Sequence, residues 1–255
     1  MHAELSYEED FAHKFIADKL RALGLTPTLG LGRAPPEFQG AGAGYERRPT
    51  GTGVMADIKG LAGPGPCIAL RADIDALPIL ETAGSAADLG GYRSINEGCM
   101  HACGHDAHTA MLLSTATVLV KHADRLRGSV RLIFQPAEEF GAGAKMMVQD
   151  GCMEVRSTLQ LGLAHASRTD CSCDMSLTGL STFRAAYRPS QGVDEVYGVH
   201  VMNFLETGTI GVKSGPLMAA PDKFSITVQG KGGHGAMPHE TVDALLVASM
   251  VCVAV

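Results

Sequence analysis

Five side chains able to bind metal ions crowd into residues 101–108 of this 255-residue chain. They are His101, Cys103, His105, Asp106 and His108. Imidazole and thiolate groups hold zinc and related ions, and carboxylates also suit manganese. His and Cys are often buried for packing alone, but five potential ligands this close together favour a metal site. The alternative chemistry is a cysteine hydrolase, with Cys103 as nucleophile and a neighbouring histidine as base.

Two acidic pairs each follow an apolar stretch that predicts a strand. Asp73 and Asp75 lie two residues apart after residues 67–70, so they share one face of an extended segment. They are suited either to binding a metal or to orienting a metal-binding histidine. Glu138 and Glu139 follow residues 130–135. Beside a metal cluster, one of these carboxylates can bind the ion while the other takes a proton from water.

Two further histidines are candidates by context. His200 is expected in the middle of a strand over 196–201, where a single histidine is more often a core residue than a ligand. His234 lies in the glycine-rich stretch 230–239, whose flexibility suits a donor to a developing oxyanion. A plain glycine-rich turn is the alternative interpretation of that stretch.

The elements that must position these residues follow from hydrophobic periodicity and turn residues. Strands are expected at 54–58, 67–70, 130–135, 196–201 and 224–229. Helices are expected at 7–23, at 108–120, at 136–149 and from 241 onward. Pro136 would be the first residue of the third helix. This alternation predicts an α/β fold, with a mainly parallel sheet and flanking helices, that binds ligands at the carboxyl ends of its strands.

Composition limits the classes of partner. A formal net charge of −6 argues against nucleic acid, and the longest apolar run, 244–255, is too short to span a bilayer. Seven cysteines without a framework spacing favour a reducing compartment. No signal peptide is visible at the start. We therefore expect a cytoplasmic protein that binds a small-molecule substrate and neither nucleic acid nor membrane.

Taken together, the motifs resemble the M20 metallopeptidase family. The resemblance is strongest to its branch of N-acyl-amino-acid amidohydrolases, which holds hippurate hydrolases and plant indole-acetyl-amino-acid hydrolases. The matching segments occur in the family's order. They are 70–78, 100–109, 134–139 with 143–145, 198–201, 208–219 and 230–239.

The resemblance implies a site with two divalent ions, Mn²⁺ or Zn²⁺. Cys103 would bridge the ions, and the further ligands would be His105, Glu139 and His200. Glu138 would activate the metal-bound water, and Asp75 would orient the site. His101, His108 and Asp106 are then left as supporting structure.

The resemblance also implies a domain plan. Residues 1–213 would form the catalytic domain, and 214–255 would begin a smaller α+β dimerisation domain. His234 would reach the active site of the partner in a homodimer and stabilise the tetrahedral intermediate there.

The implied reaction is cleavage of the amide bond of N-acyl amino acids, for example auxin–amino-acid conjugates or hippurate-like compounds. A dipeptidase or aminopeptidase is the nearest alternative. The family supplies one more metal-binding histidine near its C-terminus, whereas this sequence stops within an expected helix. We therefore expect a fragment with little or no activity, one that at most binds metal or a partner.

Residues 155–191 depart from the family pattern. Glu139 and His200 are 61 positions apart, a wider spacing than relatives show. Removal of the 37 residues from Val155 to Gln191 restores a family-like spacing and keeps the reading frame. Because a Val codon begins with GT and a Gln codon can end in AG, we predict a retained intron or a mispredicted exon. A genuine inserted loop is the alternative.

Overall fold

A computed structural model describes residues 2–35, 49–82, 92–139, 142–154, 192–215 and 226–254. These fall into two compact units, Met1–Ala219 and Ala220–Val255. The segment 155–191 lies outside the described residues, as do Phe224 and its neighbour at 225. None of the described helices is both long and apolar enough to cross a membrane.

The larger unit is built on a five-stranded sheet with the order β1-β2-β4-β3-β5. The strands are β1 (Thr28–Leu31), β2 (Gly53–Lys59), β3 (Cys67–Asp73), β4 (Ser129–Gln135) and β5 (Glu195–Gly198). Strand β3 pairs in parallel with β4 and β5, whereas β2 pairs antiparallel with β1 and β4. The expected α/β class is confirmed, and the parallel part of the sheet brings the carboxyl ends of β3, β4 and β5 to one edge.

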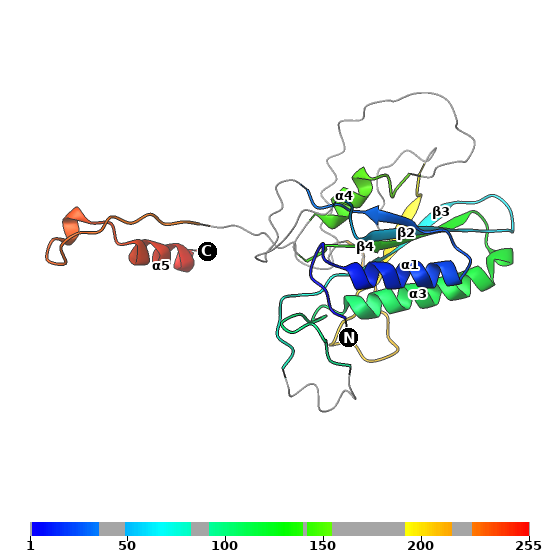
Figure 1. The fold of residues 1–255 in the computed structure, drawn as a ribbon, viewed down its shortest axis with the longest axis horizontal. Coiled ribbons are helices and arrows are strands. Elements are labelled where there is room, and N and C mark those ends of the chain that lie inside the picture. The colour runs from blue at the N-terminus through cyan, green and yellow to red at the C-terminus, as the bar shows by residue number, and fades with distance from the viewer. Residues whose placement is uncertain are drawn as a thin grey trace, which may run out of the picture. The chain divides into compact units, whose positions relative to one another are not determined.

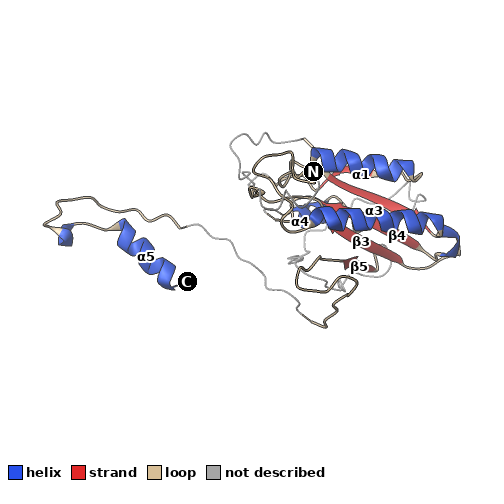
Figure 2. Ribbon diagram, turned by 90° about the horizontal axis from the view of Figure 1, so that it is seen from below, coloured by secondary structure: helices blue, strands red, loops and turns tan. Residues whose placement is uncertain are grey.

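Helices cover both faces of this sheet (Figures 1 and 2). The helices α1 (Asp10–Ala22) and α3 (His105–Lys121) lie side by side on one face, and α4 (Gly143–Gln149) lies on the other. Alternation along the strands sorts side chains between these faces. Leu132 and Phe134 of β4 pack toward α1 and α3, whereas Ile133 packs with Met147 of α4.

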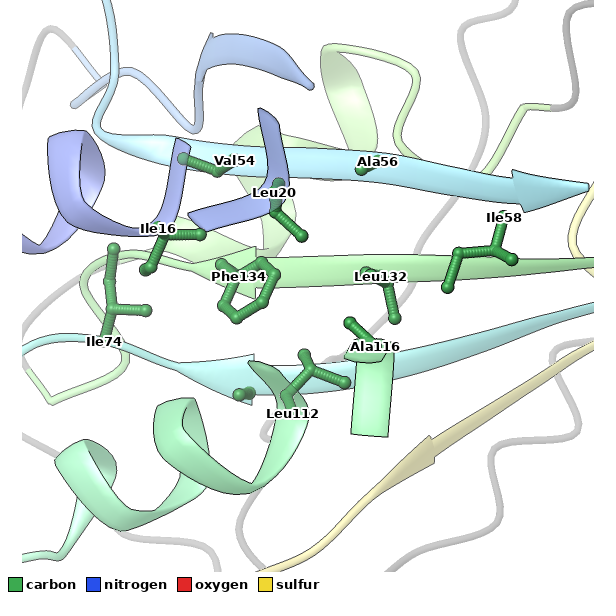
Figure 3. Close-up of a cluster of buried hydrophobic side chains, with 11 residues drawn as sticks. Ile16, Leu20, Val54, Ala56, Ile58, Ile74, Leu112, Ala116, Leu132 and Phe134 are labelled. Carbon is green, nitrogen blue, oxygen red and sulfur yellow. The ribbon is translucent and has the colours of Figure 1, made fainter. Parts of the chain in front are cut away.

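The main core lies between the sheet and the helices α1 and α3, as Figure 3 shows. Phe134, at 0% exposure, lies at its centre among side chains from both helices and from the middle strands. This core fixes the start of α3 against the end of β3. The segments that carry Asp73 and His105 are therefore held together.

The Glu138–Glu139 pair does not lie in a helix, contrary to our expectation for 136–149. Helix α4 begins only at Gly143, and Ala137 adopts a φ of +50°, which no helix residue has. The turn is closed tightly, since a Cβ on Gly143 would lie 1.8 Å from the carbonyl oxygen of Pro136. The two glutamates therefore sit on an irregular connection after β4.

His200 also differs from its expected place. Strand β5 ends at Gly198, so His200 follows the strand instead of lying in its middle. Helix α3 starts at His105, three residues earlier than expected, after Gly104 with a φ of +84°. Each difference brings a potential ligand closer to the carboxyl edge of the sheet.

The smaller unit contains the helix α5 (Ala244–Ala254), a short 3₁₀ turn at Pro238–Glu240 and a bridge between Lys231 and Val242. The described residues of the strand expected at 224–229 are not in a strand.

Candidate metal centre

The centre is assembled at the carboxyl edge of the parallel strands. Asp73 ends β3, and Asp75 follows it in the chain. His105 begins α3, the helix that crosses from β3 to β4. The Glu138–Glu139 pair follows β4, and His200 follows β5. Open α/β sheets bind their ligands at this position, outside the ends of the strands.

His105 is oriented by Asp75. Its Nδ1 lies 2.9 Å from the backbone oxygen of Asp75 and 3.2 Å from the Oδ1 of the same residue. Nδ1 therefore carries the proton and donates it, which leaves Nε2 free to face the centre. The closest acidic atoms to Nε2 are Asp73 Oδ2 at 3.5 Å and Glu139 Oε1 at 3.7 Å.

Asp75 also fixes the position of Glu139. Its Oδ2 accepts a hydrogen bond from the Ser6 hydroxyl at 2.6 Å and another from the Glu139 backbone N–H at 3.0 Å. Asp75 is fully buried. Its carboxylate therefore links the N-terminal segment, α3 and the connection that carries Glu138 and Glu139 by hydrogen bonds that are shielded from water.

Two buried atoms in the centre lack partners. His105 Nε2 and Glu139 Oε1 make no hydrogen bond within the described part of the chain. Buried polar atoms are nearly always satisfied, so two orphans that face one another across 3.7 Å indicate a missing ligand. A divalent cation fits them, because both atoms are lone-pair donors of the types that hold zinc and manganese.

Cys103 connects this pair to His200. Its Sγ lies 3.3 Å from His200 Nε2. The ligand atoms of Cys103, His105 and His200 lie within 4.8 Å of one another, as do those of His105, Glu138 and Glu139. The two groups share His105.

The charges of the centre favour a bound cation. Burial alone lowers the pKa of His105, but its hydrogen bond to Asp75 and the surrounding acidic groups outweigh burial and raise that pKa to about 11, so this imidazole holds a proton on Nε2 until a cation displaces it. Burial raises the pKa of Glu138 to about 7, although the Arg71 guanidinium opposes the shift. A carboxyl group with a pKa near neutrality is suited to accepting and returning a proton.

The expected site residues of the larger unit thus come together: Asp75, Cys103, His105, Glu138, Glu139 and His200. His234 belongs to the smaller unit, where it lies exposed in its loop and accepts a hydrogen bond from the Ala236 N–H at 3.1 Å. Its role toward the metal residues stays a prediction.

Sequence reasoning missed two residues of the N-terminal segment. Ser6 binds Asp75, and the buried carboxylate of Glu9 accepts the Ala137 N–H at 2.9 Å, next to Glu138. A serine and a glutamate before an amphipathic helix are ordinary capping residues in a sequence, so no local pattern distinguishes them.

Comparison with known proteins identifies the family. Residues 69–254 match the model of the peptidase family M20/M25/M40. An N-acyl-L-amino acid amidohydrolase of Geobacillus stearothermophilus is 39% identical over 251 residues, which cover 98% of this chain and 51% of that protein. Thermostable carboxypeptidase 2 of Saccharolobus solfataricus is 37% identical over 254 residues, which cover 99% of this chain and 49% of that protein.

A solved structure agrees with this match. A candidate aminohydrolase from methicillin-resistant Staphylococcus aureus aligns over 100% of this chain and 52% of its own, with 32% identity and a TM-score of 0.60. The chain spans about half the length of the curated relatives it matches. The resemblance noted from the motifs is confirmed at the level of the family.

Proposed function

The chain belongs to the peptidase family M20/M25/M40, and from this premise we propose that it forms the metal-binding part of an amidohydrolase acting on N-acyl amino acids. The observation that carries the proposal is the pair of unpartnered buried atoms, His105 Nε2 and Glu139 Oε1, beside Glu138. Cys103 and His200 complete the proposed ligand set. The similarity to the amidohydrolase of Geobacillus stearothermophilus favours an N-acyl amino acid over a peptide as the substrate.

Each residue has a defined task in this proposal. Divalent ions bound by these ligands would polarise the amide carbonyl and make water more acidic. Glu138 takes a proton from the attacking water and passes it to the leaving amine, which its near-neutral pKa allows. Asp75 holds His105 and Glu139 in place. The products are a carboxylic acid and an amino acid.

Several finer points belong to the same proposal. The thiolate of Cys103 favours zinc, whereas Glu139 also suits manganese. We propose a homodimer in which the His234 imidazole of one protomer donates a hydrogen bond to the oxyanion in the partner. We also propose a cytoplasmic location, which agrees with the free Cys67, Cys99 and Cys152.

Metal titration and a substrate panel test the proposal. The protein is stripped with a chelator, titrated with Mn²⁺ or Zn²⁺ by calorimetry, and assayed on N-acetyl amino acids, hippurate and indole-acetyl-amino acids. We expect saturable metal binding, and we expect any release of amino acid to depend on the metal. Glu138→Gln is the decisive variant, since it should retain metal affinity while losing roughly 10²–10⁴-fold in rate. Amide cleavage that survives both chelation and this substitution would refute the proposal.

Peptide cleavage is the second candidate, because a carboxypeptidase matches the chain almost as closely as an amidohydrolase does. The same panel extended with dipeptides and N-blocked dipeptides separates the two. Faster release of a C-terminal residue from a peptide than from an N-acetyl amino acid would favour the carboxypeptidase.

A further inference from the structure

We propose that His108 is a positioning residue that holds His200 in the metal centre through the backbone of Val201, without binding metal itself. The proposal rests on the metal centre described above and adds a residue to it. Asp73, His105 and His108 form a third group that could hold a metal, since their ligand atoms lie within 4.8 Å of one another. The proposal states what His108 does in that group. In that group His108 is a support and not a ligand.

Both ring nitrogens of His108 are already engaged. The backbone N–H of Val201 donates to His108 Nε2 at 2.9 Å, so Nε2 must present a lone pair. The proton therefore lies on Nδ1, which is 2.6 Å from Asp73 Oδ1 and donates to it. A metal ligand needs a free lone pair, and His108 has none to offer.

Asp73 enforces this tautomer because it acts only as an acceptor there. Its Oδ2 pairs with the Arg71 guanidinium at 2.7 Å, with side-chain exposures of 11% for Arg71 and 1% for Asp73. The hydroxyl of Thr109, the residue after His108, donates to the Asp73 backbone oxygen at 3.1 Å. The start of α3 and the end of β3 are thus tied at two points around the imidazole.

Val201 carries the constraint from His108 to His200. The Val201 carbonyl oxygen accepts a hydrogen bond from His200 Nδ1 at 2.7 Å, which leaves Nε2 directed at Cys103. The rings of His108 and His200 meet edge to face, with centroids 4.8 Å apart. Val201 also packs over Gly104, where an added Cβ would lie 2.3 Å from Val201 Cγ2. Outside these contacts, His200 stands on a connection beyond the end of β5.

A pair of isosteric variants separates the two nitrogens of His108. His108→Gln places an acceptor where Nε2 stood, so it can keep the bond to Val201. His108→Asn places a donor where Nδ1 stood, so it keeps the bond to Asp73 and loses the one to Val201. Calorimetric titration with Zn²⁺ should show a loss of roughly tenfold or more for the Asn variant and a much smaller loss for the Gln variant. His122→Asn, at the exposed far end of α3, is the matched control and should bind as the unaltered protein does.

A second measurement needs no metal. Long-range ¹H–¹⁵N correlation spectra of the chelator-treated protein should show His108 protonated on Nδ1 only. Hydrogen exchange at the Val201 amide should accelerate in His108→Asn and stay slow in His108→Gln. Equal effects of both variants on Zn²⁺ affinity and on Val201 exchange, or a proton on Nε2, would overturn the proposal.

These readouts distinguish this inference from the proposed function. A protein that binds Zn²⁺ but whose amide cleavage survives chelation and Glu138→Gln leaves the role of His108 intact and refutes the proposed amidohydrolase mechanism. A protein that binds no metal refutes the metal centre, and the tautomer and exchange measurements then decide the link between His108 and Val201 on their own.

Discussion

The two sides of the candidate metal centre are held in different ways. The inner wall, Asp75, His105 and Glu139, is tied to three separate elements by hydrogen bonds to a fully buried carboxylate. The outer wall, Cys103 and His200, depends on the docking of one residue, Val201, against Gly104 and His108. The inner wall therefore shares its stability with the core, whereas the outer wall can be displaced while the fold survives. Substitutions on the two sides should separate stability from metal affinity.

Removal of the central carboxylate should have the largest effect. In Asp75→Asn the amide can accept only at its oxygen, so at least one of the partners Ser6, His105 or Glu139 meets a donor instead of an acceptor. We expect a loss of about 3 kcal/mol in the free energy of unfolding, because a buried charged network is broken. We also expect roughly 10–100-fold weaker metal binding. Chemical denaturation and calorimetric titration measure the two effects.

The control for Asp75→Asn is Asp18→Asn, which makes the same chemical change at a half-exposed ion pair on α1. Its effect on both quantities should be small. If Asp75→Asn unfolded no more easily than Asp18→Asn, the inner wall would not depend on this carboxylate.

Glu9 gives the inner wall a dependence on pH. Burial, followed by the charge of Asp75, raises the pKa of Glu9 from 4.5 to about 7. Its carboxyl group contacts the Thr52 hydroxyl and the Ala137 N–H, beside Glu138. Between these two values the folded state keeps a proton that the unfolded state has released. The contribution of Glu9 to the free energy of unfolding is therefore fully present below pH 4.5 and is lost as the pH rises through 7. The shift corresponds to about 3 kcal/mol.

Glu9→Gln tests this dependence, because an amide resembles the neutral acid and does not titrate. Denaturation curves in chelator from pH 4 to 8 should show the unaltered protein losing stability relative to this variant over that window. A constant difference between the two proteins across the window would show that folding does not raise the pKa of Glu9.

The outer wall should respond to a smaller change. Gly104→Ala adds a Cβ that would lie 2.3 Å from Val201 Cγ2, at a backbone φ of +84°. The left-handed backbone alone costs roughly 1–2 kcal/mol. Gly98→Ala is the matched control, since Gly98 has a φ of +76° and no atom within 4 Å of the added Cβ. Both variants should lose similar stability, but only Gly104→Ala should weaken Zn²⁺ binding, by several-fold. Equal Zn²⁺ affinities of the two variants would show that metal binding does not depend on the packing of Val201 against Gly104.

The same contrast explains what the sequence could predict. The ligands Cys103 and His105 stand in a dense local cluster, and periodicity identifies the strands that place Asp75 and Glu138, so local rules suffice for them. Ser6 and Glu9 reach the centre only through contacts over 69 and 128 positions, which no local pattern encodes. The prediction of a helix from Pro136 was wrong because tertiary contacts hold Ala137 at a positive φ. His200 was expected in a strand because an apolar alternation continues past the last paired residue, Gly198.

Deletion of residues 155–191 is the change from which we expect the smallest effect on stability and metal affinity. The chain on both sides of them is anchored to the sheet. The Arg131 guanidinium donates to the Cys152 and Glu154 backbone oxygens at 2.8 and 2.6 Å, and Asp194 exchanges hydrogen bonds with the backbone of Cys67 at 2.7 and 2.8 Å. Glu154 and Gly192 form a bridge, and the Val193 N–H donates to the Met153 oxygen at 3.0 Å.

Deletion of these 37 residues should therefore leave the fold and the metal centre intact. With Glu154 joined to Gly192, Met153 and Val193 become the first and fourth residues of a β-turn, and their existing hydrogen bond is the one that closes such a turn. Glycine in the third position is what type II and I′ turns require. We expect a melting temperature within a few degrees of the full chain and metal affinity within about twofold. Gly192→Val in the deleted chain is the control, and it should lower the melting temperature by straining the new turn. A deleted chain that fails to fold or to bind Zn²⁺ would show that 155–191 supports the centre, and transcripts that uniformly carry it would exclude a retained intron.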